Sequence, residues 1–96
     1  SRVPFHPEAY EMAEMGFIPA GAYRNREYVK DGIVHGTVSL AMQDILYDPQ
    51  TSGGLLMALP EKDAAECLKE LNEQIPNAAI VGYVTEKEEQ WIVLES

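Results

Sequence analysis

The spacing of apolar and polar residues predicts three helices. Residues 7–15 place alanine and methionine side chains on one helical face and glutamates on the other. Residues 61–72 carry the most regular apolar stripe of the chain, which predicts a second helix. The pattern of residues 33–47 is ambiguous, because their apolar positions could also alternate along a strand. Ser39 is a favourable N-cap, however, and favours a short helix near residues 39–46.

Other segments predict strands and a loop. Residues 55–60 form a continuous apolar run bounded by glycine and proline, which is typical of a strand buried on both faces. Residues 79–84 and 90–94 are rich in β-formers and are joined by a charged turn, so they predict a hairpin. Residues 17–29 break the helical periodicity and contain proline, glycine and asparagine, which predicts a loop.

These elements predict an α+β fold in which helices pack on a mixed, mostly antiparallel sheet. The 96 residues are enough for one domain or part of one. The first forty residues contribute little strand, so the sheet lacks partners for its edge. We therefore expect the chain to be part of a larger domain, truncated on its N-terminal side.

The charge balance excludes some classes of partner. Sixteen acidic and seven basic residues give a net charge of −9 and a pI near 4.5, which argues against binding to nucleic acid or to anionic membrane surfaces. The only cysteine, Cys67, cannot form an internal disulfide, which fits a reducing compartment, and we expect the protein to be cytoplasmic. No apolar run is long enough to cross a membrane.

The least ordinary passage is residues 48–54, which read DPQTSGG. Two adjacent glycines and free backbone N–H groups can form an anion-binding concavity, to which Thr51 and Ser52 add hydroxyl donors. Asp48 could contact a metal or a sugar hydroxyl. Phosphate-binding loops, however, usually lead from a strand into a helix, whereas these glycines precede a predicted strand. A structural turn and a ligand-facing loop both remain open.

Few other residues predict chemistry. Arg24 and Arg26 lie among tyrosines and could hold a phosphate or a carboxylate, or could simply offset the acidic surface. Cys67 is flanked by glutamates in the middle of a predicted helix, which favours an inert, packed thiol. His6 and His35 have no partner at metal-ligand spacing. We therefore predict no catalytic residue and no metal ligand in this chain.

Two segments carry a resemblance to a known family. Residues 48–56, DPQTSGGLL, closely resemble a signature of selenophosphate synthetases, also called selenide, water dikinases. Residues 16–28, GFIPAGAYRNREY, are similar to the family's G-x-x-P-x-G-x-x-x-N-x-x-Y passage, with Ala20 and Ala22 where a glycine and a threonine are more usual. The order of the other elements also matches, so the resemblance covers nearly the whole chain.

The resemblance implies an activity that this chain supports only in part. The family makes selenophosphate from selenide and ATP, releases AMP and orthophosphate, and uses Mg²⁺. Its members combine an N-terminal domain with a C-terminal α/β domain in a homodimer, as in the related aminoimidazole ribonucleotide synthetases. The catalytic cysteine or selenocysteine, its lysine and the metal-binding aspartates of such enzymes lie in segments that have no counterpart here.

The resemblance therefore implies that residues 1–96 are the last part of the C-terminal domain. Alone, the chain is expected to be inactive and to bind neither ATP nor Mg²⁺. Its partners would be the missing N-terminal domain and a second copy of the protein. We expect the glycine loop to face the cleft towards the missing domain. The substrate-pocket candidates of the two segments are Asp48, Gln50, Thr51, Ser52, Gly53, Gly54, Arg24 and Asn25.

Two alternatives remain at this point. The chain could belong to a hydrogenase-maturation or purine-pathway relative of the same superfamily, although residues 50–52 of the signature argue against it. It could also be a free-standing acidic binding or regulatory module, which the complete pattern of its second half would support.

Overall fold

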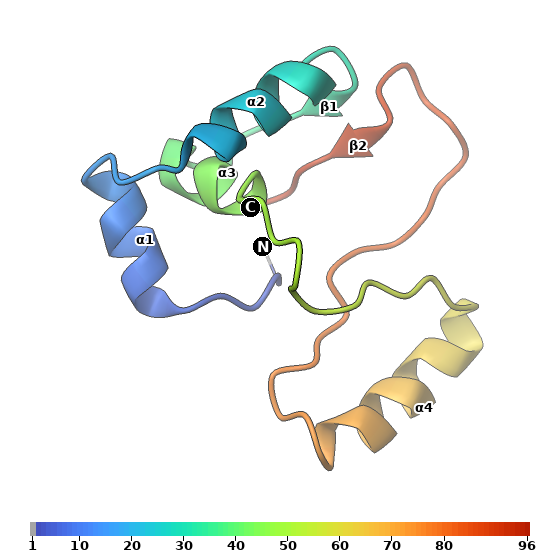
Figure 1. Cartoon of the computed structure of the whole chain (residues 1–96). Coiled ribbons are helices and arrows are strands. Elements are labelled where there is room, and N and C mark those ends of the chain that lie inside the picture. Colours follow the sequence, from blue (N-terminus) through green and yellow to red (C-terminus); the bar gives the residue numbers. More distant parts are fainter. Residues whose placement is uncertain (1) are drawn as a thin grey trace. The chain divides into compact units, whose positions relative to one another are not determined.

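The computed structural model describes residues 2–96, which form two compact units (Figure 1). The first unit comprises Phe5–Thr51 and Thr85–Ser96. The second comprises Ser52–Val84 together with Arg2–Pro4. No helix of the described residues combines the length and the apolar character that crossing a bilayer requires.

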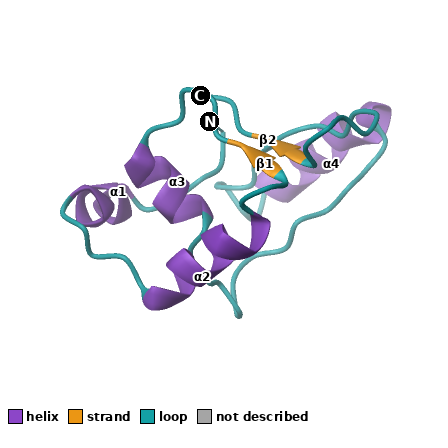
Figure 2. Cartoon of the chain, turned by 90° about the horizontal axis from the view of Figure 1, so that it is seen from above, coloured by secondary structure: helices purple, strands orange, loops and turns teal. Residues whose placement is uncertain are grey.

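The first unit is built around a short central helix. Helix α3 (Leu40–Leu46) packs against α1 (Pro7–Glu14) and α2 (Ala20–Val29), as two views show (Figures 1 and 2). Strands β1 (Ile33–Val34) and β2 (Ile92–Val93) complete the unit. Its core is small and consists of the five most buried apolar side chains: Ala13, Ala22, Val38, Ala41 and Tyr47.

Two helices that the sequence predicts in this unit are confirmed. Pro7 occupies the first turn of α1, where its missing N–H costs nothing. Gly16 follows the helix with a φ of 83°, which is why a glycine suits that position. At α3, the Ser39 hydroxyl accepts a hydrogen bond from the Met42 N–H at 3.3 Å. This N-cap favours the helix over the strand that the same segment could have formed.

The prediction of a loop over residues 17–29 is wrong for most of its length, because α2 begins at Ala20. Pro19 is the N-cap residue and fixes the entry to the helix. Helix α2 lacks an apolar stripe because it approaches α3 with a small side chain, Ala22, and with a hydrogen-bonded one, Arg26. Hydrophobic periodicity cannot detect a helix whose packed face is small and polar.

The predicted hairpin is also wrong. Within residues 2–96 the one sheet has two strands, and β1 pairs with β2 in parallel, with Ile33 opposite Ile92. The pairing continues beyond the strands, where the Leu94 N–H donates to the Val34 carbonyl at 2.8 Å. Helices and a strand pair make the fold α+β, but a mostly antiparallel sheet is not what these residues form.

The second unit contains helix α4 (Glu61–Asn72), which has the bounds that the sequence predicts. The predicted strand over residues 55–60 is not formed, and Leu55 and Leu56 are 93% and 86% exposed. The first half of the predicted hairpin, residues 79–84, is likewise irregular. A strand exists only where a neighbouring backbone accepts its hydrogen bonds, and the structure places no strand beside either segment.

Candidate functional site

A network of part-buried polar groups lies where α2 meets the end of α3. We call this group the Tyr47 cluster; it consists of Asn25, Arg26, His35, Gln43, Asp44 and Tyr47. All six residues belong to the first unit. Their contacts connect two residues of the first motif, Asn25 and Arg26, to the end of α3, directly before the second motif.

Arg26 is the centre of the Tyr47 cluster. Its guanidinium donates through Nη1 to Gln43 Oε1 at 2.8 Å and through Nη2 to Asp44 Oδ1 at 2.6 Å. The same group lies over the Tyr47 ring, 4.7 Å from the ring centroid. The sequence left open whether this arginine holds a carboxylate, and in the structure it holds one of the chain's own. Arg26 therefore ties α2 to α3 and is already engaged.

Tyr47 ends α3 and is 6% exposed. Its hydroxyl lies 2.7 Å from His35 Nε2, and the two rings meet edge to face. Burial raises the pKa of the Tyr47 phenol, and the nearby Arg26 charge partly opposes that shift. The folded chain therefore favours the neutral phenol.

The two motif segments touch at residues 48–51, which we call the 48–51 loop. Asn25 Nδ2 donates to the Tyr47 carbonyl at 2.8 Å. A Cβ added at Gly21 would lie 2.8 Å from Pro49 Cγ, so the helix backbone approaches the proline ring more closely than any side chain at this position would allow. Asn25 and Gly21 thus fix the backbone at Tyr47 and Pro49, which lie more than twenty positions later in the sequence.

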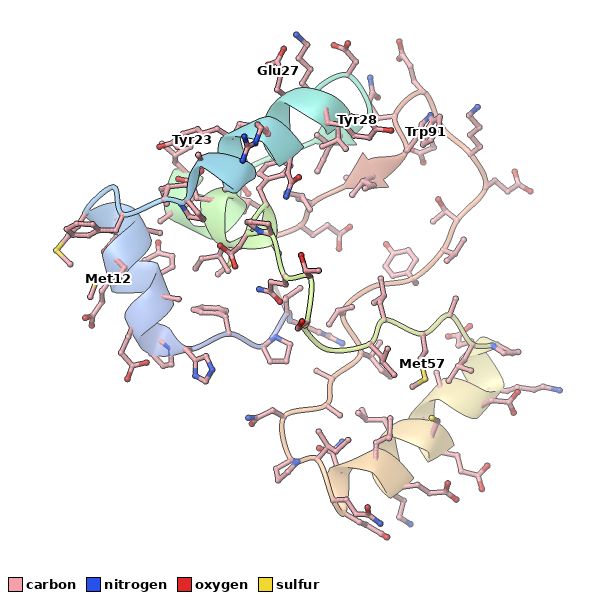
Figure 3. All side chains as sticks on the ribbon, viewed as in Figure 1. Met12, Tyr23, Glu27, Tyr28, Met57 and Trp91 are labelled. Atoms are coloured by element: carbon pink, nitrogen blue, oxygen red, sulfur yellow. The ribbon has the colours of Figure 1, made fainter. Side chains whose placement is uncertain are left out.

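The predicted pocket residues are only partly brought together. Asp48 is half-buried, and its N–H donates to the Ile45 carbonyl at 3.1 Å. Gln50 and Thr51 are exposed, and Asn25 contacts the residue before the loop. Arg24 is exposed on α2, the helix from which the labelled tyrosines of Figure 3 also extend.

The remaining candidates belong to the second unit. Ser52, Gly53 and Gly54 are exposed there. Gly54 has no positive φ, and a Cβ added to it would meet nothing within 4 Å. The chain's own conformation therefore does not require a glycine at this position.

Residues 4–94 match the family model described as AIR synthase related protein, C-terminal domain. The chain belongs to this family. It is 52% identical over 95 residues to a selenide, water dikinase of Clostridioides difficile and 46% identical over 93 residues to one of Treponema denticola. A selenide, water dikinase of Campylobacter jejuni is 43% identical over 95 residues. No solved structure matches.

These alignments cover 96%, 92% and 98% of this AIR synthase-related domain, but only 27%, 26% and 27% of the three relatives. The chain thus spans about a quarter of the length of the relatives it matches. The resemblance to selenophosphate synthetases, first carried by the two motifs, is confirmed along nearly the whole chain.

Sequence reasoning missed four members of the Tyr47 cluster in this AIR synthase-related domain: His35, Gln43, Asp44 and Tyr47. They lie outside both motifs, and no spacing rule joins them to α2. One signal was available, because Asp44 is spaced i+4 from Leu40 and i+3 from Ala41, and a carboxylate on the apolar side of a predicted helix calls for a polar partner.

The described residues offer no site for Mg²⁺. Within residues 2–96, no three His, Cys, Asp or Glu side chains gather in a way that could hold a metal ion. Mg²⁺ needs several oxygen ligands in near-octahedral geometry, which Asp48 alone does not provide.

The raised pKa of Tyr47 predicts a loss of stability in alkali. A raised pKa stabilises the folded state fully below the ordinary tyrosine pKa of about 10, and this stabilisation is lost as the pH rises through the folded value. Urea unfolding between pH 9 and pH 11.5 should therefore show a steeper fall in the free energy of unfolding for the wild type than for Tyr47→Phe. Tyr83→Phe, at a side chain that is 77% exposed, is the matched control. Equal slopes for the wild type and Tyr47→Phe would contradict the assignment.

Proposed function

We propose that the chain is part of a selenophosphate synthetase, which makes selenophosphate from selenide and ATP and releases AMP and orthophosphate. The observation that carries this proposal is the similarity to selenide, water dikinases over 92–98% of the chain, a span that includes both motifs. The close approach of Gly21 to Pro49 supports it, because these residues belong to the two motifs that carry the resemblance.

Within that enzyme, residues 1–96 would form part of the C-terminal domain. The catalytic cysteine or selenocysteine, its lysine and the Mg²⁺ ligands would come from the N-terminal domain and the start of the C-terminal one. Cys67, half-buried on α4, would not act as the nucleophile. The complete protein would be a cytoplasmic homodimer that uses ATP with Mg²⁺, whereas this chain alone would be inactive.

The extended apolar segments would become strands in the complete protein. Residues 55–60 and 79–84 carry exposed apolar side chains and backbone groups with no strand partner. Pairing with further strands would satisfy those groups and give the mixed, mostly antiparallel sheet that the sequence predicts.

The pocket wall would be formed by the two motif segments. Asp48, Gln50 and Thr51 would present polar groups on the first unit, and Arg24 and Asn25 would add groups from α2. Ser52, Gly53 and Gly54 follow these residues in the sequence and would offer the substrate backbone N–H groups, which bind anions well when no side chain intervenes.

A chimeric enzyme tests the proposal. The segment of the Clostridioides difficile relative that aligns with this chain, which is 52% identical to it, is replaced by residues 1–96. We expect the chimera to release AMP from ATP in the presence of selenide at a rate within about tenfold of the unaltered relative, since most replaced residues lie outside the reacting groups. The isolated chain, assayed beside it, should release none. A folded chimera without selenide-dependent AMP release would refute the proposal.

A further inference from the structure

The 48–51 loop leaves α3 at a point that two residues of α2 determine. Tyr47 is the C-cap residue of α3, and its carbonyl is one of the four that an α-helix leaves without an internal partner. Asn25 supplies the missing donor from a different helix, at 2.8 Å. The hydrogen bond therefore fixes the orientation of the peptide group from which the loop starts.

Gly21 determines how closely the backbone at Pro49 can approach α2. The Pro49 ring fills the space that a Cβ at Gly21 would need, with Cγ at 2.8 Å and Cβ at 3.4 Å from that position. A separation below 3.0 Å requires movement, and a proline ring cannot rotate away as a flexible side chain can. Pro49 also restricts the residue before it, Asp48, to extended conformations. A shift of Pro49 would therefore also move the backbone of Asp48.

We infer that Gly21 and Asn25 are positioning residues that hold the backbone of the 48–51 loop in one conformation. Neither residue needs to touch a substrate to do so. Gly21 sets how closely the loop lies to α2, and Asn25 sets the direction in which it leaves α3. The importance of this loop conformation for turnover rests on the proposed function, in which Asp48, Gln50 and Thr51 line the pocket.

The first test uses hydrogen exchange and does not depend on catalysis. Asn25→Asp keeps the shape of the side chain but removes the donor. The amides of Tyr47 and Asp48, which bond to the last turn of α3, should exchange about fivefold faster in this variant, as expected for the loss of one hydrogen bond.

Asn72→Asp is the matched control, because Asn72 Nδ2 donates to the Leu68 carbonyl at the end of α4. It should leave the exchange of the Tyr47 and Asp48 amides unchanged. Unchanged exchange of these amides in Asn25→Asp would overturn the inference.

The second test is a double-mutant cycle in the chimeric enzyme. Gly21→Ala should lower kcat by about tenfold or more, because the loop is displaced by the added methyl group. Pro49→Ala removes the ring atom that the methyl group meets, so the double variant should be more active than Gly21→Ala alone. Gly82→Ala, where an added Cβ meets nothing within 4 Å, controls for the loss of a glycine.

The outcomes separate the inference from the proposed function. Additive effects of Gly21→Ala and Pro49→Ala would overturn the contact between the two positions. Faster amide exchange in Asn25→Asp together with unchanged turnover would support the positioning of the loop and would instead overturn the proposal that the loop lines the pocket. If Asn25→Asp fails to fold, the cycle at Gly21 and Pro49 still decides the question.

Discussion

Replacing Arg26 with alanine should destabilise the chain by about 2 kcal/mol, the largest effect we expect from a single side chain on stability. The variant loses the hydrogen bond to Gln43, the ion pair with Asp44 and the stacking on Tyr47. It also leaves the Asp44 carboxylate, whose side chain is only 11% exposed, without its partner. The value stays below that of a fully buried pair because the Arg26 side chain is 26% exposed.

Urea unfolding followed by far-UV circular dichroism measures this loss. Lys30→Ala, at the C-cap of the same helix, is the control, because it breaks only the exposed Lys30–Glu27 pair and should leave the free energy of unfolding nearly unchanged. Arg26→Lys should fall between the two, since it keeps the charge but cannot bond to Gln43 and Asp44 at once. Equal costs for Arg26→Ala and Lys30→Ala would show that the Tyr47 cluster does not stabilise the fold.

Replacing Gly54 with alanine should separate function from stability. The chain has open space around Gly54, so the free energy of unfolding of the chain should change by less than about 0.5 kcal/mol. In the chimeric enzyme the same change should lower selenide-dependent AMP release by about tenfold or more, because the proposed pocket wall presents bare backbone at this point.

The control for this experiment is Gly82→Ala, at the other exposed glycine of the second unit with open space around it. It should change neither stability nor AMP release. Normal AMP release by Gly54→Ala would mean that the substrate does not approach the backbone there. Unfolding of the isolated chain by Gly54→Ala would instead mean that this glycine has a structural role.

The elements that the sequence predicts well are those with a local cause. Helix α4 repeats its apolar positions over three turns, and α3 has its N-cap in Ser39, so both could be placed without knowledge of the rest of the chain. Helix α2 could not be placed, because its packed face carries Ala22 and Arg26 instead of large apolar groups. Its stability comes from contacts with α3, which no local pattern contains.

For residues 55–60 the error is the opposite one, because the sequence predicts a strand that the structure does not form. Residues 55–60 have the composition of a buried strand, but composition does not supply the partner that a strand needs. The pairing of Ile33 with Ile92 was missed because both strands are two residues long and far apart in the sequence. For the candidate site, the motifs identified the 48–51 loop and Asn25, whereas the contact partners Asp44 and Tyr47 emerged only from the structure.

The order of the two units along the chain determines where the chain tolerates changes in length. Ser52–Val84 is an insertion between α3 and β2, and the contact of Thr37 with Ser96 closes a loop of 59 positions around it. The entropy of closing such a loop grows only with the logarithm of its length, so even doubling the length of this loop would cost only about 0.6 kcal/mol. Length variation should thus be tolerated inside the insertion. Strand β2 follows the insertion in the sequence, so the sheet of the first unit can form only after the insertion has been synthesised.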